Sequence, residues 1–208
     1  MIAYYGNFQS SIAENGKEAG FYGLNNPQLL LPVNHSGNLI PYGWNVYPGV
    51  MKYYSFTPGN VTLSINPGTK KGNYTCSIND PAVDISRLSY NNIIYSMQAK
   101  VYINTSETNI NRLAISNITF GINLTFDNGK YYMLFEENMT GTNSPQSLSQ
   151  NAILFPSLNL NFTEIFNYAS TLHWNMQTSL TNLRLFVNEK NNDINTTVSF
   201  FGIHEVVQ

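Results

Sequence analysis

Residues 115–140 read ISNITFGINLTFDNGKYYMLFEENMT, and this stretch decides the fold class. Its first half alternates Asn, Thr and Gly with five large apolar residues, Ile118, Phe120, Ile122, Leu124 and Phe126. An alternation of period two is typical of a strand with one buried face and one face in water. Asn128 and Gly129 follow, and Asn-Gly accepts positive φ at both central turn positions. We therefore expect a tight hairpin whose return strand covers residues 131–138.

The register of this hairpin depends on the length of its turn. A two-residue turn places Tyr131, Met133 and Phe135 on the same face as the apolar residues of the first strand. A longer loop shifts the pairing by one residue and exchanges the two faces of the return strand. The sequence leaves both registers open.

Other segments repeat the strand pattern. Residues 93–103 form the longest clean alternation, and shorter ones occupy residues 61–65, 74–78, 183–187 and 195–207. Residues 163–172 instead have helical spacing, and Thr163 can cap a helix there. Many short strands with turns between them and one short helix predict an all-β fold, a β-sandwich. Without a repeat or a linker, we expect residues 14–208 to form one domain.

Composition narrows the classes of function. Charged residues make up 11% of the 208 residues, against about 25% in average soluble proteins. The net charge is −2 and there is no basic patch, so nucleic-acid binding has no electrostatic basis. No apolar run approaches the ~20 residues of a membrane span. Cys76 is the single cysteine, which excludes an intrachain disulfide and favours a buried thiol.

The chain is rich in N-glycosylation motifs. Such motifs occur at nine positions: Asn34, Asn60, Asn73, Asn104, Asn117, Asn123, Asn138, Asn161 and Asn195. Some matches must arise by chance in a chain rich in Asn and Thr. Asn117 and Asn123 are the strongest candidates, because they fall on the polar side of the first strand of the hairpin. We expect a secreted, extracellular glycoprotein with N-linked glycans and no other cofactor.

From residue 43 onward, the order of segments resembles the glycoside hydrolase family twelve endoglucanases. VYPGV at 46–50 resembles their Tyr-Pro segment, and PAVDIS at 81–86 resembles the Leu-Pro-Val segment before a long strand. Residues 159–172 are similar to their single helix, and LRLFVNE at 183–189 is similar to the strand that ends in their acid/base glutamate. The resemblance implies a jelly-roll-like β-sandwich with a concave cleft.

The catalytic residues of that family are not all present. Retaining glycosidases need two carboxyl groups about 5 Å apart. Only Glu189 matches, because Tyr131 stands at the position of the family's nucleophile and Gly121 at that of a further acidic residue. A shifted alignment could recruit Glu136 or Glu137. We expect no hydrolase activity and no catalytic residues.

The sequence gives only weak evidence for a metal site or for a site that stacks on sugar rings. His35, His173 and His204 lack the spacing of metal ligands, so we expect no metal site. One aromatic cluster could stack on sugar rings, although packing in the core and on sheet faces is the commoner role of such residues. It consists of Trp44, Tyr47, Tyr53, Tyr54 and Phe56.

Residues 1–13 read MIAYYGNFQSSIA, and four of their large apolar residues fall on even positions, as on one face of a strand. Glycines follow at 16, 20 and 23. Residues 1–13 could be the first strand of the domain or an arm that pairs elsewhere. With the glycosylation motifs, this segment resembles the subunits of archaeal thread filaments. That resemblance implies a donor strand that enters the next subunit, with Ile2, Tyr4, Phe8 and Ile12 filling pockets and Gly6 lying where the groove is tight.

The sequence thus predicts a non-catalytic structural subunit of an extracellular, N-glycosylated cell-surface filament, which would act in adhesion or biofilm formation. Its partners would be identical subunits in a head-to-tail polymer, and surface glycans. Two alternatives stay open, a divergent secreted β-glucan hydrolase and a carbohydrate-binding β-sandwich module. An exposed row of aromatic side chains on the concave face would favour the second alternative.

Overall fold

The computed structural model describes residues 24–46, 52–81, 83, 85–88, 94–104, 117–126, 131–138, 152–171 and 182–206. The first strands are β1 (Pro32–His35), β2 (Asn38–Pro41), β3 (Asn45–Val46), β4 (Lys52–Thr57), β5 (Asn60–Ile65) and β6 (Gly72–Asp80). They are followed by β7 (Ile94–Asn104), β8 (Asn117–Thr125), β9 (Tyr131–Asn138), β10 (Ala152–Leu160), β11 (Asn182–Asn192), β12 (Asn195–Phe201) and β13 (His204–Val206). The two helices are α2 (Ile85–Leu88) and α4 (Phe162–Thr171).

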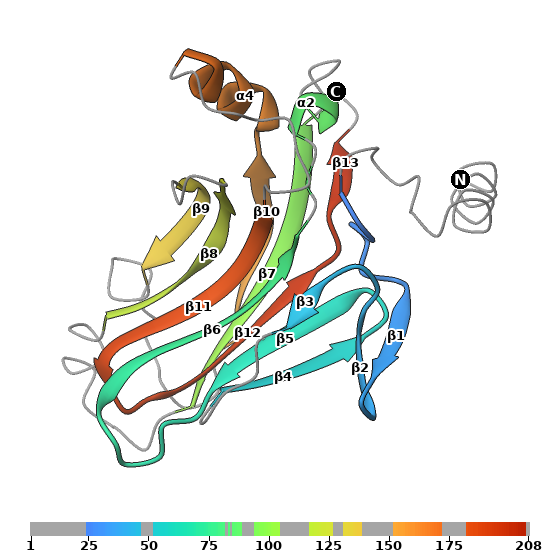
Figure 1. Cartoon of the computed structure of the whole chain (residues 1–208). Helices are drawn as coiled ribbons and strands as arrows, with labels where there is room; N and C mark the ends of the chain where they lie inside the picture. The colour runs from blue at the N-terminus through green and yellow to red at the C-terminus, as the bar shows by residue number, and fades with distance from the viewer. Residues whose placement is uncertain are drawn as a thin grey trace.

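Two antiparallel sheets lie face to face (Figure 1). One, here named the β11 sheet, has the order β3-β6-β11-β8-β9. The other, the β12 sheet, has the order β10-β7-β12-β5-β4, with β13 also paired to β7. The chain changes sheet at each step from β5 to β8 and again from β10 to β12, as in a jelly roll. The predicted all-β, jelly-roll-like β-sandwich is confirmed.

The inner faces of the two sheets supply the core. On β7, Tyr95, Met97, Ala99 and Val101 are buried while Gln98 is exposed, as the alternation in residues 93–103 predicts. The rings of Phe120 on β8 and Phe200 on β12 meet across the two sheets, with centroids 6.3 Å apart. Each such buried side chain contributes about 1.5–3 kcal/mol to stability.

The β8–β9 hairpin uses both of the registers that the sequence left open. Near the turn, Leu124 pairs with Tyr132, which is the register of the longer loop. A bulge between Ile122 and Asn123 then shifts the pairing, so that Ile122 lies opposite Phe135. One extra residue in β9 thus returns the large aromatic side chain to the inner side of the sheet.

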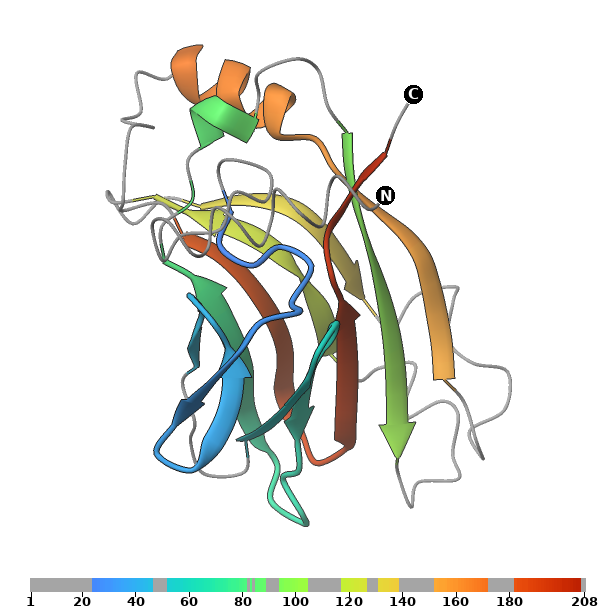
Figure 2. The ribbon, with the colours of Figure 1, turned by 90° about the vertical axis from the view of Figure 1, so that its right-hand side faces the viewer.

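The helices lie together at one end of the sandwich (Figure 2). The predicted helix is confirmed as α4, but its cap is not Thr163. Asn161 Oδ1 accepts a hydrogen bond from the backbone N–H of Glu164 at 3.1 Å, which is the geometry of an N-cap. Phe162 buries its ring against Tyr95, with centroids 5.4 Å apart. The short helix α2 was not predicted.

The last predicted strand, residues 195–207, is two strands in the structure. Gly202 separates β12 from β13, and a Cβ at this position would lie 2.4 Å from the carbonyl oxygen of Gln28. The backbone N–H of Ile203 donates to the carbonyl oxygen of Pro27 at 2.7 Å. The strand breaks because the segment before β1 crosses here and takes its hydrogen bonds.

Candidate functional site

Glu189, the one residue that matches the glycosidase acid/base, lies inside the sandwich. It shares the inner face of β11 with Leu185 and Val187, and its side chain is 1% exposed. It pairs with Tyr74 on β6 and with Ile118 on β8. Neither carboxyl oxygen has a hydrogen-bond partner. A carboxyl group in this position does not face an open cleft.

Burial changes the acidity of this group. Loss of solvation raises the pKa of Glu189 from 4.5 to about 7. The hydroxyl group of Thr196, on the inner face of β12, is near enough to lower the pKa in part, although the two groups do not meet the geometry of a regular hydrogen bond, and the nearby carboxylate of Asp193 raises the pKa. Thr196 Oγ1 is also buried without a hydrogen-bond partner. Two orphaned polar groups therefore occupy the core where β11 turns into β12.

Of the other carboxyl groups considered from the sequence, Glu136 lies on the face opposite to that of Glu189, whereas Glu137 shares its inner face. Glu136 lies opposite Gly121, on the outer face of the β11 sheet, and is exposed. Glu137 lies opposite Phe120, two residues along β8 from the partner of Glu189. Tyr131 pairs with Thr125 at the start of β9. Since Glu136 and Glu189 lie on opposite faces, they do not converge on one bond as a retaining mechanism requires.

The nine glycosylation motifs fall in different environments. The side chains of Asn34, Asn73, Asn161 and Asn195 are exposed, and that of Asn60 is half-buried. Asn104, Asn117 and Asn138 lie on strands, but their side chains are outside what the structure describes.

The expectation that Asn123 faces water is wrong. Its side chain is 7% exposed, and its Oδ1 has no hydrogen-bond partner. Its cross-strand neighbours are Arg184 and Met133, both half-buried. Long side chains on either side shield a residue that strand parity alone placed in solvent. A glycan is better accommodated at the four exposed positions.

Within the part of the chain that the structure describes, one edge of the β11 sheet has few strand partners. Among the residues that the structure describes, only Asn45 and Val46 of β3 pair with the outer edge of β6, opposite Asn79 and Ile78. Residues 72–77 of β6 pair with β11 on their other side. Unpaired backbone groups on an edge strand are a template for another strand.

The other sheet edges carry features that oppose strand addition. Lys52 lies on β4, Glu136 and Glu137 lie on β9, and Pro156 lies on β10 at a shift in register. Charged residues and proline on edge strands prevent pairing with further chains. Residues 72–77, GNYTCS, contain neither a charge nor a proline. The free edge of β6 is therefore the least protected one among the described strands.

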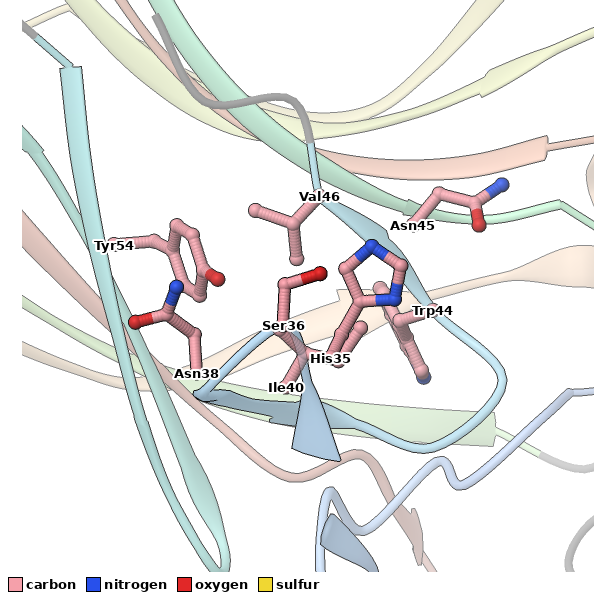
Figure 3. A pocket seen from close by; sticks show the side chains of 8 residues that line it. All are labelled: His35, Ser36, Asn38, Ile40, Trp44, Asn45, Val46 and Tyr54. Atoms are coloured by element: carbon pink, nitrogen blue, oxygen red, sulfur yellow. The ribbon is translucent and has the colours of Figure 1, made fainter. Parts of the chain in front are cut away.

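A cavity of about 590 Å³ lies beside this edge, between the β1–β2 hairpin and strands β3 and β4 (Figure 3). Its volume is in the range of small-molecule sites, about 300–1,000 Å³. The described residues that line it are His35, Ser36, Asn38, Ile40, Trp44, Asn45, Val46 and Tyr54.

A buried carboxylate fixes one wall of this cavity. Asp80, fully buried at the end of β6, accepts hydrogen bonds at 2.7 Å from both the backbone N–H and the side-chain amide of Asn25. The carbonyl oxygen of Asn25 accepts a hydrogen bond from Trp44 Nε1 at 2.7 Å. Gly43 has φ +81°, and a Cβ there would lie 2.8 Å from Asn25 Cβ. This chain of contacts holds the indole in one position, and no sequence pattern signalled it.

The four described members of the aromatic cluster noted in the sequence do not form an exposed row for sugar stacking. Trp44 and Phe56 are buried, Tyr54 is half-buried, Tyr53 is 55% exposed, and Tyr47 lies outside the described residues. The proposed arm, residues 1–13 with Ile2, Tyr4, Gly6, Phe8 and Ile12, also lies outside them. Cys76 is a free, buried thiol, as expected.

The described part of the chain contains neither a cluster of metal ligands nor a helix that could span a membrane. No three His, Cys, Asp or Glu side chains in it gather closely enough to hold a metal ion. None of its helices has the length and apolar character needed to cross a membrane.

No protein-family model matches this chain, and no curated protein matches it in sequence. Solved structures resemble it distantly. TmCBM61 in complex with β-1,4-galactotriose is 7% identical, with a TM-score of 0.35 over 80% of this chain and 90% of its own. Xylanase10C from Cellvibrio japonicus, in complex with xylopentaose, is 10% identical with a TM-score of 0.34 over 85% of this chain and 28% of its own. The VP2 subviral particle of infectious bursal disease virus is 11% identical with a TM-score of 0.30, over 83% and 40%. At such similarity, no ligand or activity transfers to this chain.

Proposed function

We propose that this chain is a non-catalytic structural subunit of an extracellular, N-glycosylated filament, in which an arm of one copy pairs with the next copy. The observation that carries the proposal is the edge of β6 at residues 72–77, which pairs with no described strand on its outer side and lacks both charge and proline. Backbone hydrogen bonds to such an edge supply affinity, and alternate side chains supply specificity. A contact of this kind that does not close on itself generates a filament.

The arm that we propose is residues 1–13. Its apolar residues Ile2, Tyr4, Phe8 and Ile12 share one parity, so all four would face the same side of an added strand. Beneath the edge, Cys76 Sγ contacts the carbonyl oxygen of Tyr53 on β4 at 3.4 Å, so β4 closes the core there. An added strand would therefore extend the β11 sheet and cover β4. Burial of four such side chains contributes about 1.5–3 kcal/mol each before ordering costs.

A glycosylated surface suits an extracellular subunit. The exposed motifs at Asn34, Asn161 and Asn195 lie away from residues 72–77 in the sequence, and Asn73 lies at the start of that edge. The side chain of Asn73 belongs to the outer face of the sheet, where its Oδ1 accepts a hydrogen bond from the backbone N–H of Asn191 at 2.9 Å. A glycan on Asn73 would thus leave the sheet from its face.

The experiment compares filament formation by the full chain and by two lysine variants, using negative-stain electron microscopy. Ser77→Lys places a charge on the free edge of β6 and should abolish filaments. Ser55→Lys, the matched control, places the same charge on β4, whose edge already carries Lys52. Deletion of residues 1–13 and Phe8→Asp should also abolish them. Filaments that persist in Ser77→Lys and in the deletion variant would refute the proposal.

A second candidate function is binding of carbohydrate. The specific observation that favours it is the cavity at the β1–β2 hairpin, which contains a half-buried tyrosine ring among amide and hydroxyl groups. Hydrolysis gains no comparable support, because Glu189 faces the core. Hydrolysis of a soluble β-glucan that is lost in Glu189→Gln would argue against a non-catalytic role.

A further inference from the structure

We propose that the cavity between the β1–β2 hairpin and strands β3 and β4 is a binding site for a short neutral saccharide, with Tyr54 and Asn38 as the main contacts. The inference rests on the residues of the cavity and not on filament assembly. Figure 3 shows Tyr54 and Asn38 on one side of the cavity, with His35 and Ser36 between them and Trp44.

The hairpin that forms one wall has a tight, hydrogen-bonded turn. His35 pairs with Asn38, so Ser36 and Gly37 alone make the turn. Their φ values are +51° and +87°, as in the two-residue turns that match the twist of a hairpin. Asn34 Oδ1 accepts a hydrogen bond from the backbone N–H of Gly37 at 2.9 Å and holds the turn closed. A non-glycine residue at positive φ is uncommon and fixes the direction in which Ser36 leaves the turn.

The opposite walls are formed by Trp44 and Tyr54, and contacts with the core hold both residues in place. Trp44 is 2% exposed and is held through Asn25 by the buried carboxylate of Asp80. Tyr54 pairs with Leu63 on β5, packs against the core and also lines the cavity. Groups that are already in place lose little freedom when a ligand binds, which is the condition for affinity in a small site.

The polar and apolar groups that line the cavity determine which class of ligand fits it. None of the eight lining residues that the structure describes is Asp, Glu, Lys or Arg, so a charged ligand would be desolvated there without a counter-charge from them. A wholly apolar ligand would cover the amides of Asn38 and Asn45 and the hydroxyl of Ser36 without giving them partners. A sugar presents C–H groups to the ring of Tyr54 and to Ile40, and presents hydroxyl groups to the amides.

Two sources could supply such a saccharide, an N-glycan on another copy of this chain or a polysaccharide of the surroundings. Isothermal titration on the full chain separates them with two sets of probes. One set is the oligosaccharides released from the native protein, and the other is cellohexaose and xylohexaose. A synthetic peptide of residues 1–13 is the third probe, because an arm could also enter the cavity.

We expect one saccharide per chain to bind, and we expect the affinity to fall about tenfold in Tyr54→Ala through loss of the ring contact. Asn38→Ala, at an exposed position that the fold does not need, should weaken binding similarly. Tyr53→Ala is the matched control, because this neighbour on β4 is 55% exposed and does not line the cavity. Binding by either set of saccharides supports the site and identifies its source. Absence of heat with every saccharide, binding of the peptide alone, or equal affinity in Tyr54→Ala and Asn38→Ala would overturn it.

Discussion

Two carboxyl groups are buried on the inner face of the β11 sheet, at opposite ends of the paired strands β6 and β11. They differ in their hydrogen bonds. Asp80 is fully buried and accepts two hydrogen bonds of 2.7 Å from Asn25. Glu189 is 1% exposed, and neither of its oxygens has a hydrogen-bond partner. A buried charge is tolerated when hydrogen bonds replace water, and otherwise the group takes up a proton.

Asp80 and Glu189 therefore have different roles in the fold. Asp80 ties the segment before β1 to β6 and, through Asn25, fixes Trp44 in the wall of the cavity. Glu189 connects no elements by hydrogen bonds, and Thr196 beside it is orphaned as well. Asp80 therefore stabilises the fold through its two hydrogen bonds with Asn25, whereas burial favours the neutral form of Glu189.

The largest effect should come from removing the satisfied carboxylate. Asp80→Ala leaves the backbone N–H and the amide of Asn25 without acceptors in a buried place. The free energy of unfolding should fall by about 3–5 kcal/mol, because each charged hydrogen bond is worth about 1.5–3 kcal/mol. Urea denaturation at pH 7 measures the fall. A loss below 1 kcal/mol would mean that these hydrogen bonds are no better than those to water.

The second effect concerns pH. The unfolded chain releases the proton of Glu189 near pH 4.5, whereas the folded chain keeps it until about pH 7. Between these values the folded state binds more protons, so the contribution of Glu189 to stability is complete below pH 4.5 and is lost as the pH rises to 7 and above. The difference of 2.5 pH units corresponds to about 3 kcal/mol.

Glu189→Gln provides the control for this pH effect. It keeps the shape of the side chain and removes the titration, so the variant should be more stable than the natural chain above pH 7 and should match it more closely near pH 4. The difference between the two unfolding free energies, measured by urea denaturation from pH 4 to pH 8, isolates this one group. A difference that does not change with pH would contradict a buried, neutral Glu189.

The smallest effect should come from Thr196→Val. This change removes a hydroxyl group that makes no hydrogen bond of regular geometry and keeps the shape of the side chain, so stability should stay the same or rise by up to about 1 kcal/mol. Loss of the hydroxyl should also raise the pKa of Glu189 further, since Thr196 now lowers it. Thermal unfolding at pH 5 and pH 8 checks both points. A large loss of stability would show that Thr196 has a partner that the geometry does not reveal.

Strand parity predicted most of the sandwich, and it also indicates that Glu189 lies on the inner face. Leu183, Leu185 and Val187 alternate, and Glu189 continues their parity into the core. The resemblance of Glu189 to a catalytic glutamate therefore conflicted with the strand alternation around it, which predicts that Glu189 is buried. The same parity placed Asn123 in water, and this was wrong, because parity shows which face a residue is on but not what neighbouring side chains cover.

Contacts between distant segments could not be predicted. Asp80 shares the parity of Cys76 and Ile78, which indicates burial, but its partner Asn25 is 55 residues away in an irregular segment. The cavity depends on that pair and on the hairpin turn at Ser36, where the sequence lacks the usual Asn-Gly signal. The break at Gly202 likewise arises from Pro27 and Gln28, which are distant in the sequence.

The central claim is that another copy adds a strand to the free edge of β6. Electron cryomicroscopy of the full-length native protein tests it most directly. The proposal predicts filaments in which a strand made of residues 1–13 of one copy pairs with residues 72–77 of the next. Particles that are only monomers, or an arm that pairs within its own chain or along β4, β9 or β10, would contradict it.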